Sequence, residues 1–182
     1  MASGVRIHSV IVQKSNHNQI SKKRCNQQLL DGGAEMNVLF VCNGNVARSQ
    51  IAEAMFNHLS DQHQAVSAGT AVRQLDVEGQ TLKAHSEDPN APATPVIVLG
   101  LMKEKGFDIS SHTRNQVTPE MVDTADRVIL MLGRVPPKDF LAKSEKTEIW
   151  NISDPVRTSQ ESTAITLDEV TARVQALVED LG

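Results

Sequence analysis

Residues 37–59 read NVLFVCNGNVARSQIAEAMFNHL, and this stretch decides the fold class. Residues 38–41 are apolar and rich in β-branched and aromatic types, which is typical of a buried strand. Residues 43–45 are Asn-Gly-Asn, types that tolerate positive φ and mark a loop. Large apolar residues then recur at four-residue spacing from Ile51 to Leu59, as on one face of a helix. We therefore expect a strand, a tight loop and a helix in this order.

Strand and helix patterns continue to alternate along the rest of the chain. We expect further strands at residues 65–68, 127–132 and 147–152, and helices at 94–105, from 118 and from 166 to 181. Such alternation is typical of a parallel sheet covered by helices. The sequence thus predicts an α/β fold, a three-layer sandwich with a four-stranded parallel sheet and helices on both faces.

Local signals set several expected boundaries. Residues 76–95 are polar and contain three prolines, which predicts an exposed loop. Thr94 before Pro95 predicts a capped helix start, because proline is favoured at the first helical position. Thr166 and Glu169 have the spacing of a capping box, so the last helix is expected to begin there.

Length and composition exclude several classes of protein. A chain of 182 residues fits one domain, and 18 basic against 22 acidic residues give a net charge of −4. This charge, with only 3% aromatic residues, disfavours a nucleic-acid-binding protein. No apolar run approaches the ~18 residues of a membrane span. Two cysteines and six histidines without ligand spacing predict neither a disulfide framework nor a metal site.

The first 35 residues differ in composition from the rest of the chain. They are basic and polar, with no convincing hydrophobic period. Three interpretations remain open: a disordered extension, a targeting presequence, or a mis-assigned start before Met36. We favour disorder or mis-assignment and expect the folded domain to span residues 36–182.

The loop after the first expected strand has the composition of an oxyanion site. It reads Cys42-Asn43-Gly44-Asn45-Val46-Ala47-Arg48-Ser49, and ligands of open parallel sheets bind where a strand ends and a helix begins. Glycine and asparagine let successive N–H groups point inward, and the following helix adds its positive end. An arginine fork binds two oxygens of a tetrahedral oxyanion. A cysteine at the base of such a loop is favoured as the thiolate.

The alternative for these residues is a buried cysteine at a strand end with a surface arginine nearby. The combined placement of Cys42, Arg48 and Ser49 between a strand and a helix favours the functional interpretation. The loop lacks the Gly-Lys-Ser/Thr ending of nucleotide-binding phosphate loops.

The segment VLFVCNGNVARSQIAEAMF resembles the active-site loop of the low-molecular-weight protein tyrosine phosphatase family, and related thioredoxin-coupled arsenate reductases share it. The resemblance extends over the whole domain through four shorter segments. These are Ser67-Ala68-Gly69-Thr70, residues 106–118 with His112, Ala125-Asp126-Arg127, and the late Asp154-Pro155.

The resemblance implies a role for each matching residue. Cys42 would be the nucleophile, Arg48 would bind the phosphoryl oxygens, and Asp154 would be the general acid. Residues 43–49 would form the phosphate-binding loop, with Asn45 holding its unusual backbone and Ser49 supporting the thiolate. His112 would either support the loop or be an ordinary surface histidine. Trp150 is expected to pack in the core rather than line the site.

Some positions depart from the family pattern. Many members carry a second cysteine where this chain has Ala47, so protection of the nucleophile by a disulfide should be absent. Val156 and Arg157 follow the Asp-Pro pair, where tyrosine-selective members often have aromatic residues. Arsenate reductases of this fold use two further cysteines, and none follows Cys42 here.

We therefore expect a cysteine-dependent phosphatase that hydrolyses phosphomonoesters, protein phosphotyrosine or similar, through a phosphocysteine and without a cofactor. The alternative is an arsenate reductase that uses an external thiol donor, and a third class is a non-catalytic oxyanion-binding module. The expected partner is a phosphorylated protein or small phosphomonoester, with no nucleic acid and no membrane. We expect a cytoplasmic monomer or weak dimer.

Overall fold

The structure, a computed structural model, describes residues 34–155 and 158–182. The interpretations of residues 1–33, and of Val156 and Arg157, lie outside the described residues. Residues Glu35–Gly182 form one compact unit. Within the described ranges, no helix combines the length and the apolar content needed to cross a membrane.

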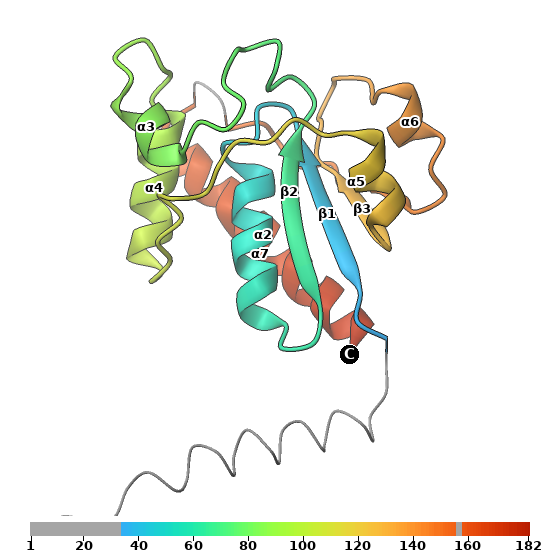
Figure 1. Cartoon of the computed structure of the whole chain (residues 1–182). Helices are drawn as coiled ribbons and strands as arrows, with labels where there is room; N and C mark the ends of the chain where they lie inside the picture. Colours follow the sequence, from blue (N-terminus) through green and yellow to red (C-terminus); the bar gives the residue numbers. More distant parts are fainter. Residues whose placement is uncertain (1–33, 156–157) are drawn as a thin grey trace, which may run out of the picture. The chain divides into compact units, whose positions relative to one another are not determined.

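Four parallel strands form the sheet, as expected. They are β1 (Asn37–Cys42), β2 (Gln64–Gly69), β3 (Arg127–Leu130) and β4 (Thr147–Ile149). The strand order is β2-β1-β3-β4, so β1 pairs on both sides. Its last residue, Cys42, lies beside Gly69 at the end of β2. The carboxyl ends of these two strands thus meet at one edge of the sheet, where the loop begins (Figure 1).

Helices cover both faces of the sheet, which confirms the three-layer α/β prediction (Figure 1). The helices are α2 (Arg48–Leu59), α3 (Leu82–Glu87), α4 (Thr94–Glu104), α5 (Pro119–Thr124), α6 (Asp139–Ala142) and α7 (Gln160–Leu181). Helices α2, α4 and α7 share one core cluster with the sheet, and α5 and α6 share the other.

Alternation along β1 sends side chains into both cores. Phe40 and Cys42 belong to the cluster under α2 and α7, whereas Leu39 and Val41 belong to the opposite cluster. Trp150 is 4% exposed and packs on Phe40, with ring centroids 5.9 Å apart, so the prediction that it lies in the core is confirmed. The same alternation places the Cys42 side chain on the α2 face, at the start of the loop.

The expected loop at residues 76–95 was partly wrong, because it contains helix α3. Thr81 caps this helix by accepting a hydrogen bond from the Ala84 N–H at 3.1 Å. Leu82 and His85 are buried, which stabilises a helix too short to show a period in the sequence.

One expected helix start and one expected cap residue were also wrong. Helix α7 begins at Gln160, where Ser159 accepts from the Ser162 N–H, and Thr166 lies inside the helix and donates to the Ser162 carbonyl. The spacing of a capping box therefore occurred within a helix. Helix α4 begins at Thr94, as expected, but its cap position is Ala93 and not Thr94. Strands β3 and β4 end at Leu130 and Ile149, two and three residues earlier than expected.

Candidate active site

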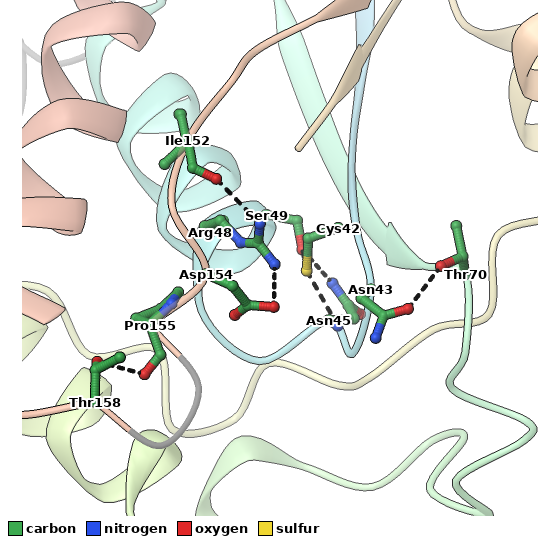
Figure 2. A network of polar contacts seen from close by, with 10 residues as sticks. All are labelled: Cys42, Asn43, Asn45, Arg48, Ser49, Thr70, Ile152, Asp154, Pro155 and Thr158. Atoms are coloured by element: carbon green, nitrogen blue, oxygen red, sulfur yellow. Dashed lines mark hydrogen bonds and ion pairs between the residues drawn. The ribbon is translucent and has the colours of Figure 1, made fainter. Parts of the chain in front are cut away.

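The loop between β1 and α2 has one residue in the left-handed region. Asn45 has a φ of 51° and is fully buried. Its side-chain nitrogen Nδ2 donates to the Ser49 and Ser67 hydroxyls, each at 2.9 Å, and its side-chain oxygen Oδ1 accepts from the Asn115 N–H at 2.7 Å. Asparagine tolerates this conformation better than most residues, and three hydrogen bonds hold it. The loop is therefore fixed in its curled form (Figure 2).

The Cys42 sulfur lies at the base of this curl and is buried. The Asn45 backbone N–H donates to it at 3.2 Å, and the Ser49 hydroxyl lies 3.1 Å away (Figure 2). Donors from the loop and the start of α2 thus converge on the sulfur.

Arg48 and Asp154 meet beside this sulfur. The Arg48 guanidinium is 2% exposed, donates from Nη1 to the Ile152 carbonyl at 3.3 Å, and contacts the Asp154 carboxylate from Nη2 at 2.8 Å. The Asp154 side chain is 43% exposed. The three expected catalytic residues therefore lie together, from the end of β1, the start of α2 and the segment after β4 (Figure 2).

Sequence reasoning missed several residues that support the loop. Gln50 donates to the Asn45 carbonyl at 3.3 Å, and its own oxygen lies 2.9 Å from the His112 ring nitrogen Nδ1. His112 therefore supports the loop through Gln50, which is the first of its two expected alternatives. Thr70 similarly donates to the Asn43 side chain at 3.1 Å.

Arg114 is a second buried arginine that the sequence did not point to. It is 2% exposed and donates from Nε and Nη2 to the Gly44 carbonyl, at 3.0 and 2.8 Å. An arginine in an irregular segment usually lies in solvent, so no local signal marks it. Only its position in space, 70 residues from Gly44 along the chain, shows its contact with the loop.

The loop opens into a cavity of about 420 Å³, a volume within the ~300–1,000 Å³ typical of ligand sites. Residues of the loop line one side, and residues between Leu75 and Thr94 line the other, with Arg114 and Asp154. Burial lowers the pKa of His85 in this wall, and the Arg114 charge lowers it further, whereas Asp88 acts in the opposite direction. His85 is therefore neutral at pH 7.

The described residues include no group of three or more His, Cys, Asp or Glu side chains that could hold a metal ion. The groups that they bring together are a buried sulfur with one backbone N–H donor, a buried guanidinium and a carboxylate.

The chain belongs to the low-molecular-weight phosphotyrosine protein phosphatase family, whose model matches residues 37–182. The resemblance inferred from the loop is thereby confirmed. An arsenate reductase from Shouchella clausii is 31% identical over 150 residues, which cover 78% of this chain and 94% of that protein.

Two solved structures show the same fold. Wzb from Vibrio vulnificus, in complex with benzylphosphonate, gives a TM-score of 0.64 at 22% identity, covering 82% of this chain and 100% of that one. An arsenate reductase in the phosphate-binding state gives a TM-score of 0.61 at 26% identity, covering 81% of this chain and 99% of that one.

Gly69 is expected to be required for the loop's position. A Cβ atom at Gly69 would lie 2.7 Å from the Asn43 oxygen and 2.9 Å from the Asn45 nitrogen, so the loop would have to move. We expect Gly69→Ala to lower the free energy of unfolding by about 1–3 kcal/mol and to reduce turnover of an aryl phosphate. Denaturant unfolding and steady-state kinetics measure both effects.

The matched control is Gly100→Ala, because a Cβ atom there meets nothing within 4 Å. Gly100 lies inside α4, where alanine stabilises a helix by roughly 1 kcal/mol relative to glycine. A Gly69→Ala protein with wild-type stability and turnover would contradict the expectation that the loop leaves no room for a Cβ atom at Gly69.

Proposed function

We propose that this protein is a phosphatase in which Cys42, Arg48 and Asp154 hydrolyse phosphomonoesters through a phosphocysteine. The observation that supports this most directly is the convergence of these three side chains at one cavity. The family match supports the reaction class.

In the first step, the Cys42 thiolate attacks phosphorus, the S–P bond forms and the ester P–O bond breaks. The amides of residues 43–49 and the Arg48 fork stabilise the charge on the phosphoryl oxygens. Asp154 contacts Arg48 at 2.8 Å, so it is within reach of an oxygen on a phosphorus held by that arginine. Its proton goes to the leaving oxygen, which would otherwise depart as an unstable anion.

In the second step, the Asp154 carboxylate takes a proton from water as the water oxygen attacks phosphorus. The S–P bond breaks, inorganic phosphate forms, and Cys42 returns to the thiolate. The same carboxylate thus acts first as acid and then as base. No metal or cofactor takes part in the proposed steps.

The cavity favours a leaving group that packs against aliphatic side chains. Its lining residues in the described part of the chain include Leu75, Val77 and Pro92 but no Phe, Tyr or Trp. A substrate ring would therefore be held by apolar contact rather than aromatic stacking. The proposed substrate is a phosphotyrosine side chain or a small phosphomonoester. The proposed enzyme is a cytoplasmic monomer or weak dimer.

The decisive test is direct detection of the intermediate. We expect rapid acid quenching during turnover of 4-nitrophenyl phosphate to leave one phosphoryl group on the peptide that contains Cys42, as measured by mass spectrometry. Turnover without any phosphorylated Cys42, under conditions in which product release shows a burst, would refute the proposed route.

Asp154→Asn is expected to lower kcat more for poor leaving groups than for good ones. The amide cannot donate the proton that an alkoxide-like leaving oxygen needs, and positioned acids contribute about 10²–10⁴-fold. We expect a loss near the upper value with phenyl phosphate and a much smaller loss with 4-nitrophenyl phosphate, in parallel steady-state assays.

Asp88→Asn is the matched control for this variant. Asp88 lines the same cavity but accepts its hydrogen bond from the Asn90 N–H at 2.8 Å, away from Arg48. An equal loss in both variants, or a loss independent of the leaving group, would argue against Asp154 as the acid.

A second candidate function is arsenate reduction, because curated arsenate reductases reach 31% identity over 150 residues. Arsenate resembles phosphate in shape and charge, so the same loop would accept it. No cysteine follows Cys42 in the sequence, so the two electrons would have to come from external thiols, which become a disulfide. Arsenite production that depends on added glutathione or thioredoxin, with negligible aryl phosphate hydrolysis, would favour this function.

A further inference from the structure

The position of the Arg114 side chain is set by its backbone. The Arg114 N–H donates to the Gln80 carbonyl at 2.9 Å, and the Arg114 carbonyl accepts from the Gly79 N–H at 2.8 Å. The side chain then donates two hydrogen bonds to the Gly44 carbonyl. A segment outside the loop thus holds the Arg114 guanidinium against it.

The Gly44 carbonyl belongs to the same peptide group as the Asn45 N–H. In a planar trans peptide these two bonds point in opposite directions. Arg114 holds the oxygen on one side, and on the other side the N–H donates to the Cys42 sulfur at 3.2 Å. Holding the oxygen therefore fixes the direction in which the N–H points.

The charge of Arg114 has one evident counterpart. A buried charge is costly unless it is compensated. Within the described residues, no carboxylate lies at ion-pair distance from Arg114, and its Nη1 atom has no hydrogen-bond partner. Burial lowers the pKa of Arg114, and the negative charge of Cys42 opposes this effect. Arg114 and Cys42 therefore lie close enough to interact electrostatically.

We propose that Arg114 is a positioning residue for the proposed reaction: it aims the Asn45 N–H at the Cys42 sulfur and places a positive charge beside the thiolate. The proposal rests on the phosphatase function above. Sulfur is the nucleophile in the first step and the leaving group in the second, so both steps use this stabilisation. Arg114 acts through the loop and the sulfur, without a required contact to substrate.

The test compares Arg114→Met and Arg114→Lys in the full-length chain carrying Cys25→Ser, so that only Cys42 is alkylated. The measurements are the rate of iodoacetamide alkylation as a function of pH, kcat and KM for 4-nitrophenyl phosphate, and denaturant unfolding. The matched control is Gln116→Met, which removes a buried polar side chain from the same segment. Gln116 bonds to Thr70, Val117 and Arg73 rather than to the loop residues 42–48.

We expect Arg114→Met to lower kcat by about 10- to 100-fold, the equivalent of losing charged hydrogen bonds, with a smaller change in KM. Alkylation at neutral pH should slow about 10-fold, and its rise should move to higher pH. Arg114→Lys keeps the charge and should recover part of both effects. Gln116→Met should lose stability but keep the wild-type alkylation profile.

A purely structural role predicts a different result. If Arg114→Met alkylates as the wild type does at every pH, and loses no more kcat than Gln116→Met, the inference is overturned. A wild-type protein that alkylates rapidly but hydrolyses no aryl phosphate would instead refute the proposed function. In that case, slower alkylation of Arg114→Met would still support the effect of Arg114 on the sulfur.

Discussion

Replacement of Cys42 by serine is expected to reduce turnover of aryl phosphates by at least about 10⁴-fold, because the reaction loses its proposed nucleophile. A serine hydroxyl is not ionised near neutral pH, and the Asn45 N–H that faces the sulfur cannot make it so. The fold and the amides of the loop remain, so binding of inorganic phosphate should persist. Steady-state kinetics and calorimetric titration with phosphate measure the two properties separately.

Cys25→Ser is the control, since it removes the other cysteine of the chain. We expect this variant to retain full turnover. Undiminished activity of the Cys42→Ser protein would refute a phosphocysteine intermediate, even if the protein still binds inorganic phosphate.

Arg48→Lys is expected to lower kcat/KM by about 10²–10³-fold although the positive charge is kept. The Arg48 guanidinium is buried and contacts Ile152 and Asp154 from two of its nitrogens, which fixes the plane of the fork. Lysine offers a single ammonium group and cannot bind two oxygens in one plane. Both KM and the inhibition constant for phosphate should rise, and kcat should fall.

Arg173→Lys is the matched substitution outside the site. Arg173 also pairs with a carboxylate, Glu169 at 3.5 Å, and lies over the Trp150 ring. We expect kcat/KM to change by less than about twofold, because exposed ion pairs contribute little. Similar losses in the two variants would show that Arg48 acts through general stability and not through phosphoryl binding.

The parts of the fold that sequence reasoning predicted well are those with strong local signals. Strand β1, the Asn-Gly-Asn loop and helix α2 follow one another within 23 residues, and each has a composition that favours one structure. Parallel topology then brings Cys42 and the segment after β4 to one edge of the sheet. This is why the sequence could predict that Cys42, Arg48 and Asp154 lie together.

Other features depend on contacts between segments that are far apart in the sequence, so the sequence of one segment does not predict them. Helix α3 owes its stability to the burial of Leu82 and His85, and its sequence carries only the Thr81 cap as a signal. Arg114 has its role only because the fold brings it to Gly44. The start of α7 was misplaced because Thr166 and Glu169 have cap spacing within a continuous helix.

The packing of Trp150 also has an optical consequence. It is the single tryptophan of a chain without tyrosine, so intrinsic ultraviolet fluorescence arises almost entirely from one indole. That indole is buried against Phe40. Trp150 also lies two residues before Ile152, whose carbonyl accepts a hydrogen bond from Arg48. The emission of this protein therefore reports on one end of the sheet, beside the arginine that an incoming oxyanion would engage.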